Sequence, residues 1–468
     1  QAGVGDCFDE LYLSSERRAR KDRGDLWDVV LDQEGVAADR WLHVGDNERS
    51  DIQAAADRGI RTYHCMNPTT LLELRGFRCL TAADAEHWGT DLLLGPVTAT
   101  LANDPFLAGA AFDPVVVADT DALGYTAFGP VVMAFLVWMT QHPALADVDH
   151  LYFLAREGYL LRELWERVRA AGRPDLPAST YLLTSRRASM AAAQAVAFDA
   201  DQILQGFGFD GTVRELLAAR IGLVLPEGDE LADLRLTLPD DDVAARKILN
   251  ELEDVIVAHG AGELEHMVGY LRQVGLVGPS AAGPSAAGVV DIGYSATIQK
   301  HLQVLVGRGL TGFYMGTLSK ANEVAVTGGA AYGCFAEDVP KWTPTSPFHR
   351  YSILLEAFLT APQGQVERAE IHGDDVVHHF RPEYRTAEEL GVIERLHAGA
   401  TRYCEDLLRS YGTAILDVPI DLAAVLDLVT MVATGAIRSP AATSALVVDD
   451  DFCGLPRRVI MANGSRLG

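Results

Sequence analysis

The stretch "RWLHVGDNERSDIQAAADRGIRTYHC", residues 40–65, sets the fold class. An apolar run stops abruptly at Gly45-Asp46, a segment with helical spacing follows, and a second short apolar run begins at Ile60. One strand, one helix and another strand in this order predict two parallel strands joined by a crossover helix. Upstream, the same logic predicts a strand at Glu10–Ser15 and a helix at Gly24–Gly35, so the N-terminal part is predicted to be a Rossmann-like parallel sheet.

The α/β pattern returns later in the chain, after the apolar helix "GPVVMAFLVWM" (residues 129–139). Three apolar runs, "HLYFL", "STYLL" and "VVDIG", each precede a segment with helical periodicity. The predicted fold is therefore α/β: a partial Rossmann-like sheet, a second α/β domain with large helical insertions, and a helical C-terminal region. The corresponding domains are 1–66, a linker or lid at 67–121, a second α/β domain at 122–335 with a helical insertion at 190–275, and 336–468.

Composition narrows the classes of function. The 468 residues include 65 acids and 39 bases, a net charge of −26, which argues against nucleic acid or an anionic membrane as the main partner. No apolar run is long enough to predict a membrane span. The six cysteines form no CxxC pair, which favours reduced thiols and a cytoplasmic location. The predicted partner is a small phosphorylated substrate, a sugar or a nucleotide; the oligomeric state is left open.

Asp46 and Asp51 lie where the first of these strands ends. The carboxyl end of a buried parallel strand faces the crevice in which open α/β sheets bind ligands. Two carboxylates at this spacing suit one Mg²⁺ ion, which prefers oxygen ligands. An equally strong alternative is an Asp-Asn turn in which Asp51 follows Ser50 as part of a helix cap.

The order "LYLSS", Lys21, then "GDNERSD" resembles motifs two, three and four of the haloacid dehalogenase superfamily of phosphatases and hydrolases. The resemblance implies that Ser14, with Ser15 as second choice, and Lys21 hold a phosphoryl group, and that Asp46 and Asp51 bind Mg²⁺. "SSERRARKDRGDLWDVVL" and "LHVGDNERSD" look in particular like predicted hydrolases of this superfamily that are encoded among polysaccharide-assembly genes. The family's first motif, whose Asp is the nucleophile, is not found before Ser14.

The second α/β unit offers an anion site of its own. "VVDIGYSATIQKHL" places Asp291 at a strand end and Ser295 and Thr297 at the start of a helix, which predicts a phosphate cradle. It weakly resembles the phosphate loop of type I phosphoribosyltransferases, although that loop has two adjacent acids. Arg156 and Arg186 follow two other strands and suit bidentate anion binding. The alternatives are a helix simply capped by Ser295 and arginines in rim salt bridges.

Two classes of function follow from these residues. The first is a Mg²⁺-dependent phosphatase of the haloacid dehalogenase type that acts on a phosphorylated sugar or nucleotide. The second is a non-catalytic or transferase-like α/β protein that binds a phosphorylated ligand, in a phosphoribosyltransferase-like or sugar-nucleotide site, at Asp291 and Ser295. The second class does not need the missing Asp nucleophile.

Overall fold

The computed structural model divides the chain into two compact units, one formed by residues 1–82 and 97–113 and the other by residues 83–96 and 114–468. It describes residues 7–77, 85–103, 115–117, 119–205, 208–278, 286–340, 346–373, 375–439, 446–448, 459–462 and 465–466. The small repeat "GPSAAGPSAAG", predicted to be a surface loop, falls mostly outside the described residues. The four regions predicted from the sequence, 1–66, 67–121, 122–335 and 336–468, are a finer division than these two units and stay a prediction.

The first unit contains a two-stranded parallel sheet of β1 (Leu42–Gly45) and β2 (Arg61–His64). Between them the chain forms a π-helical turn (Glu48–Gln53) and α3 (Ala54–Ala56), as expected for a crossover. Helix α2 (Asp25–Glu34) contributes Trp27, which packs with Ala55 and Ile60 into a small core.

The predicted strand at Glu10–Ser15 is wrong. Within the described part of this unit, only β1 and β2 pair, and the segment instead enters the short helix α1 (Ser14–Arg17). Leu11 and Leu13 alternate as a strand would require, yet both side chains remain at least half exposed. An alternating pattern yields a strand only where a neighbouring edge is free to pair with it and where one face is buried.

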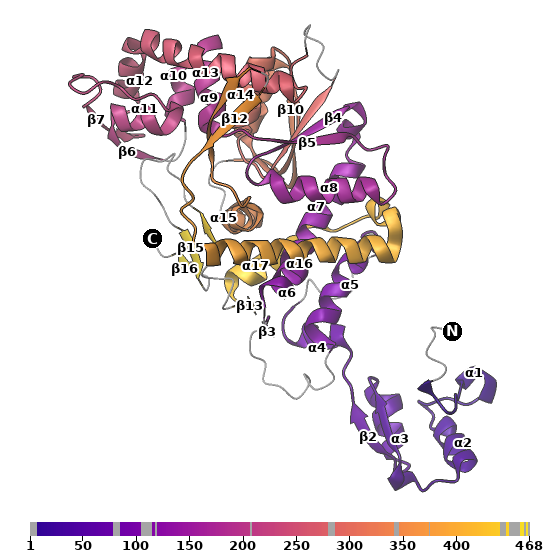
Figure 1. Cartoon of the computed structure of the whole chain (residues 1–468). Coiled ribbons are helices and arrows are strands. Elements are labelled where there is room, and N and C mark those ends of the chain that lie inside the picture. The colour runs from indigo at the N-terminus through magenta and orange to yellow at the C-terminus, as the bar shows by residue number, and fades with distance from the viewer. Residues whose placement is uncertain are drawn as a thin grey trace. The chain divides into compact units, whose positions relative to one another are not determined.

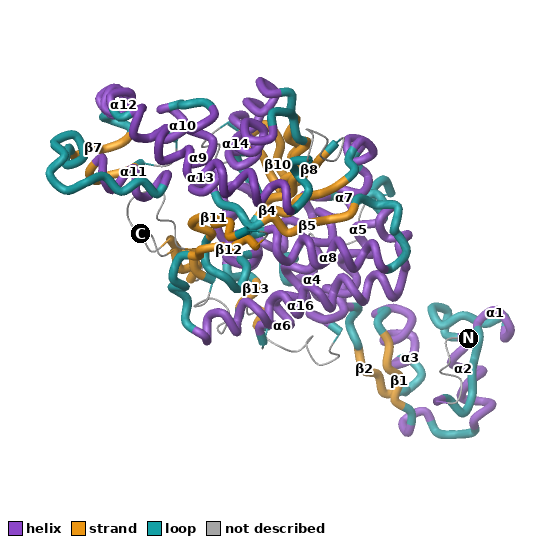
Figure 2. Tube along the Cα trace, turned by 45° about the horizontal axis from the view of Figure 1, so that its top comes forward, coloured by secondary structure: helices purple, strands orange, loops and turns teal. Residues whose placement is uncertain are grey.

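The second unit is organised by a five-stranded, wholly parallel sheet with the order β10–β9–β8–β4–β5. Figures 1 and 2 show β4, β5 and β10 of this sheet among the helices of the unit. Its strands are β4 (His150–Leu154), β5 (Ala178–Leu182), β8 (Ala287–Asp291), β9 (Thr311–Leu318) and β10 (Ala330–Val339). Numbered by their order along the chain, these strands run 2-1-3-4-5 across the sheet, the arrangement of flavodoxin-like doubly wound folds. The α/β class predicted from the sequence is confirmed.

Helices cover both faces of this sheet. Tyr152 and Leu154 of β4 pack in one core with side chains of α9 (Arg186–Val196), α13 (Glu253–Gln273) and α14 (Thr297–Val306). Phe153, between them in sequence, points to the other face and contacts Trp165 of α8 (Gly158–Ala170). This alternation explains why β4 is apolar throughout, since each successive side chain enters a different buried layer.

The remaining helices complete the same unit. Between β5 and β8 the chain forms α10 (Ala200–Leu204), α11 (Val213–Ile221), α12 (Asp242–Glu251) and a two-stranded antiparallel sheet of β6 (Phe209–Thr212) and β7 (Arg235–Leu238), which share a core. The C-terminal part supplies α15 (Pro347–Leu359), the long α16 (Ala387–Tyr411) and α17 (Leu422–Thr434), and an antiparallel hairpin of β11 (Val366–His372) and β12 (Asp375–Phe380).

One helical stretch in the described chain, Thr120–Gln141, has the length and hydropathy to cross a membrane. Its C-terminal part is α7 (Gly129–Gln141), the apolar run noted in the sequence. Within its most apolar window, 83% of the residues are buried inside the protein. The high hydropathy is accounted for by packing on all sides inside a folded core.

Candidate functional site

The parallel sheet brings the ends of β4 and β8 together. These strands are neighbours, but the chain leaves β4 toward β5 on one side and leaves β8 toward β9 on the other. Such a switch point is where open α/β sheets bind ligands. Arg156 and Glu157 follow β4, and Asp291 ends β8, so charged groups from two distant parts of the sequence meet here.

Asp291 is the central acid of this site. It is the last residue of β8, its side chain is only 9% exposed, and its carboxylate accepts the backbone N–H of Ile292 at 2.8 Å. Burial raises the pKa of Asp291 well above its usual value, the negative charges of Glu157 and Glu356 raise it further, and Arg186 partly opposes them. A carboxyl group in this state takes up and releases protons nearer neutral pH than a surface Asp does.

Arg156 follows the neighbouring strand β4 and contributes a positive charge to the same cluster, through Glu157 and Glu356. Its Nε lies 4.0 Å from Glu157 Oε1, and the two side chains are 15% and 17% exposed. Burial alone lowers the pKa of Arg156, but Glu157, Tyr384 and Glu356 more than compensate, so the pKa is raised overall. The guanidinium is thus held in a poorly hydrated position, where a bidentate contact to a phosphate or carboxylate is stronger than at the surface.

Sequence reasoning missed the contribution of α15. Tyr294 Oη donates a hydrogen bond to Glu356 Oε1 at 2.5 Å, and burial raises the pKa of Tyr294 well above its usual value, as does Glu356. Helix α15 thus contributes Glu356, which is the third acid of the cluster beside Asp291 and Glu157. Its signal in the sequence was a single acid inside the apolar run "YSILLEAFL", a placement that requires a buried polar partner.

The helix that follows β8 begins without a side-chain cap. Its N-cap residue is Ala296, in a left-handed conformation, so the alternative that Ser295 merely caps the helix is wrong. Ser295 and Thr297, both half-buried, flank the first backbone N–H groups of α14. Uncapped N–H groups at the start of a ten-residue helix attract an anion, because the helix dipole is positive there.

Arg186 occupies the first position of α9, next to β5. Its charge lowers the pKa of Asp291 and also that of His301, so it acts on both β8 and α14. His301 is buried, and its Nδ1 lies 3.0 Å from Ser189 Oγ. Burial first, and then Lys300 and Arg186, lower the pKa of His301 to about 3, so this imidazole is neutral at physiological pH.

The residues of the dehalogenase-like resemblance lie in the first unit. Ser14 and Lys21 line one hollow of about 520 Å³, together with Asn47 and Arg49. Asp51 is buried and accepts hydrogen bonds from Lys21 Nζ at 2.6 Å and from the Asn47 N–H at 3.1 Å.

The predicted pairing of Asp46 and Asp51 around Mg²⁺ stays a prediction, and in this structure Asp51 already has partners. His43 Nε2 is 3.1 Å from the same Asp51 oxygen that binds Lys21, so the carboxylate is already neutralised and its oxygens are in use. Burial raises the pKa of Asp51, but the hydrogen bonds from Lys21, His43 and Asn47 outweigh it and the pKa is lowered overall. Asp46 is exposed at the strand end. Across the ranges that the structure describes, no group of three His, Cys, Asp or Glu residues is arranged to hold a metal ion.

Comparison with known proteins gives a short partial match. Over 150 residues the chain is 29% identical to the tRNA-2-methylthio-N(6)-dimethylallyladenosine synthases of Stenotrophomonas maltophilia strains K279a and R551-3. The match covers 31% of this chain and 28% of each relative, so the chain spans less than a third of their length. A match of this extent does not place the chain in their family. No family model matches the chain.

These findings correct the first predicted function. The relatives are named for the synthesis of a modified tRNA nucleoside, not for the hydrolysis of a phosphate ester, and nothing in the comparisons connects the chain with polysaccharide assembly. The prediction of a haloacid dehalogenase-type phosphatase is therefore wrong, and the resemblance in sequence motifs stays a prediction without a function attached.

Proposed function

We propose that the protein is a transferase-like α/β protein that binds a phosphorylated ligand at the carboxyl edge of its five-stranded sheet. The observation that carries this proposal is the meeting of Arg156, Asp291 and the uncapped start of α14 at the switch point between β4 and β8. Arginine and free helix N–H groups bind phosphate oxygens, and a buried carboxyl group accepts hydrogen bonds from sugar hydroxyls. A sugar nucleotide or a phosphoribosyl compound has both kinds of group.

In a transfer reaction each of these residues has a distinct task. Arg156 and the first N–H groups of α14 stabilise the negative charge that develops on a departing phosphate. Asp291, whose pKa is raised by burial, accepts the proton from the hydroxyl or amine that receives the transferred group. We do not propose tRNA, which the names of the partial relatives mention, as a ligand of this protein. Its net charge of −26 opposes the binding of a polyanion.

We place the protein in the cytoplasm. Four cysteines within the described ranges, Cys7, Cys65, Cys334 and Cys404, are free thiols, which supports a reducing compartment.

Binding of UDP-glucose and of inorganic pyrophosphate, measured by isothermal titration calorimetry, tests the proposal. Asp291→Asn and Arg156→Gln are expected to weaken binding at least about tenfold, since each removes a charged hydrogen-bonding group. Asp46→Asn, in the other unit, is the matched control and leaves binding unchanged. Binding that is lost with Asp46→Asn, or kept with both variants at the sheet edge, would refute the proposal.

A further inference from the structure

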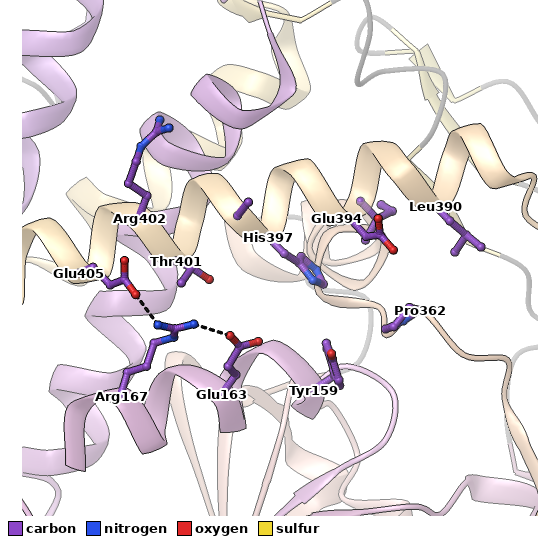
Figure 3. Close-up of a pocket in the computed structure, with 12 residues that line it drawn as sticks. Tyr159, Glu163, Arg167, Pro362, Leu390, Glu394, His397, Thr401, Arg402 and Glu405 are labelled. Atoms are coloured by element: carbon purple, nitrogen blue, oxygen red, sulfur yellow. Dashed lines mark hydrogen bonds and ion pairs between the residues drawn. The ribbon is translucent and has the colours of Figure 1, made fainter. Parts of the chain in front are cut away.

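A second cavity lies in the same unit, between α8 and α16, and has a volume of about 440 Å³ (Figure 3). This volume is in the range of small-molecule sites. One part of its wall is apolar and is formed by Pro362, Leu390 and Ile393. The rest of the wall is polar and charged, so the cavity suits a ligand that has one apolar and one polar end.

One carboxylate that lines the cavity, that of Glu394, has no ion-pair partner among the described residues. Arg167 is shared between Glu163, whose Oε1 is 2.7 Å away, and Glu405, as the dashed lines in Figure 3 show. Arg402 points its charge at Asp121, 2.5 Å away. Glu394, by contrast, makes no hydrogen bond or ion pair with any residue that the structure describes. Its carboxylate is free to accept hydrogen bonds from a ligand.

His397 adds a second acceptor, one helical turn from Glu394. The side chain is 9% exposed, and its Nε2 lies 2.6 Å from the backbone carbonyl of Phe358, so this nitrogen carries the proton and donates it. Burial lowers the pKa of His397 to about 4, which keeps the ring neutral at pH 7. Nδ1 is then an acceptor, and in the described part of the chain it has no partner.

The ligand must therefore supply donors and positive charge. An anion would be repelled by Glu394, and a neutral alcohol would gain no attraction from its charge. An ammonium group has three N–H donors and a positive charge, which match Glu394 and His397 Nδ1, while an alkyl stem fits the apolar wall. Figure 3 shows both acceptors projecting from the same stretch of α16, with Pro362 below them.

We infer that this cavity is a binding site for a primary alkylammonium group, held by Glu394 and His397 with its alkyl stem on Leu390, Ile393 and Pro362. The inference does not depend on the proposed phosphate site. It concerns a ligand of opposite charge and rests on residues that the other site does not use.

Saturation-transfer NMR with the whole chain tests the inference, with n-butylammonium as the probe and 1-butanol and tetramethylammonium as its neutral and donor-free analogues. Butylammonium is expected to bind at least about tenfold more tightly than either analogue, because only it has both the charge and the N–H donors. Equal binding of 1-butanol would show a merely apolar hole, and equal binding of tetramethylammonium would exclude hydrogen bonding to Nδ1. Either result overturns the inference.

Three variants locate the site. Glu394→Gln is expected to weaken butylammonium binding about tenfold, and Glu388→Gln, an exposed glutamate on the same helix, to leave it unchanged. Ala398→Lys places an ammonium group four residues after Glu394, within reach of its carboxylate, and is expected to block the probe. Both Glu394 and Ala398 are exposed, so these changes leave the fold intact. Undiminished binding to Glu394→Gln or to Ala398→Lys refutes the assignment.

Discussion

Replacing Asp291 by Asn should make the second unit more stable at neutral pH while removing its ligand affinity. Burial and two neighbouring glutamates raise the pKa of Asp291 in the folded protein, so the folded state disfavours the charged form. A group of this kind stabilises the fold fully only below its unfolded pKa, near 4, and that stability is lost as the pH rises toward the folded pKa. Asn has the same shape and no charge to bury.

The magnitude follows from proton linkage. Each unit by which the pKa is raised costs the folded state about 1.4 kcal/mol once the pH exceeds the folded pKa. Burial raises the pKa of Asp291 well above its usual value, so we expect Asn to stabilise the unit at pH 7. The expected gain is about 1 to 3 kcal/mol, the range for relieving an unfavourably buried polar group. The gain should shrink as the pH falls through the unfolded pKa and vanish near about pH 3, where Asp291 is protonated in both states. The side-chain oxygen of Asn still accepts the Ile292 N–H.

The assay is urea unfolding between about pH 3 and pH 8. Hydrogen exchange of peptides from β4 and β8 is the readout, so that the first unit does not contribute to the signal. Asp240→Asn is the control, because this aspartate is exposed. It should change stability little at any pH. A gain from Asp291→Asn that is independent of pH, or a loss of stability at pH 7, would refute the argument that a buried charge is the cause.

Three further predictions concern single groups. Gly293→Ala should destabilise the second unit by at least about 2 kcal/mol in thermal unfolding, because Gly293 has a φ of +139° and a Cβ there would lie 2.3 Å from the carbonyl oxygen of Gly316; a neutral result would exclude a close approach at this turn. Lys21→Met should destabilise the first unit by about 1 kcal/mol at pH 7, a value reduced because Lys21 is 41% exposed. The pKa of Asp51 is lowered, so this loss should begin to shrink as the pH falls below about 4 and disappear once the pH is below the lowered pKa; a loss that persists through this whole acid range would mean packing and not charge. His301→Gln should remove part of the acid sensitivity, since the pKa of His301 is lowered to about 3 and the wild type loses stability as the pH falls from 6.5 toward that value; equal acid unfolding curves for both proteins would contradict this.

The strand-end residues of the second unit were predictable from local pattern. Arg156, Arg186 and Asp291 each follow an apolar run that precedes a helical segment, and in a parallel sheet all such positions lie on one edge. This local pattern of apolar runs and helical segments does not predict the order of the strands in the sheet. That β8 inserts beside β4, and so brings Asp291 to Arg156, depends on long-range packing, and the sequence alone gave no reason to prefer this neighbour.

The same limit explains both the failure in the first unit and the site residues that were missed. Leu11 and Leu13 alternate as in a strand, but this segment pairs with no described strand and both residues remain at least half exposed. Glu356 comes from a helix more than sixty residues beyond Asp291, and only its isolation in an apolar run marks it. A buried acid is unfavourable unless a partner or a function compensates it, and in Asp291, Glu157 and Glu356 three acids share one sheet edge. Such an arrangement lowers stability, and a sheet edge with a purely structural role would not need it. If Asp291→Asn raises stability and weakens binding, these opposite effects would identify this edge as the ligand-binding site.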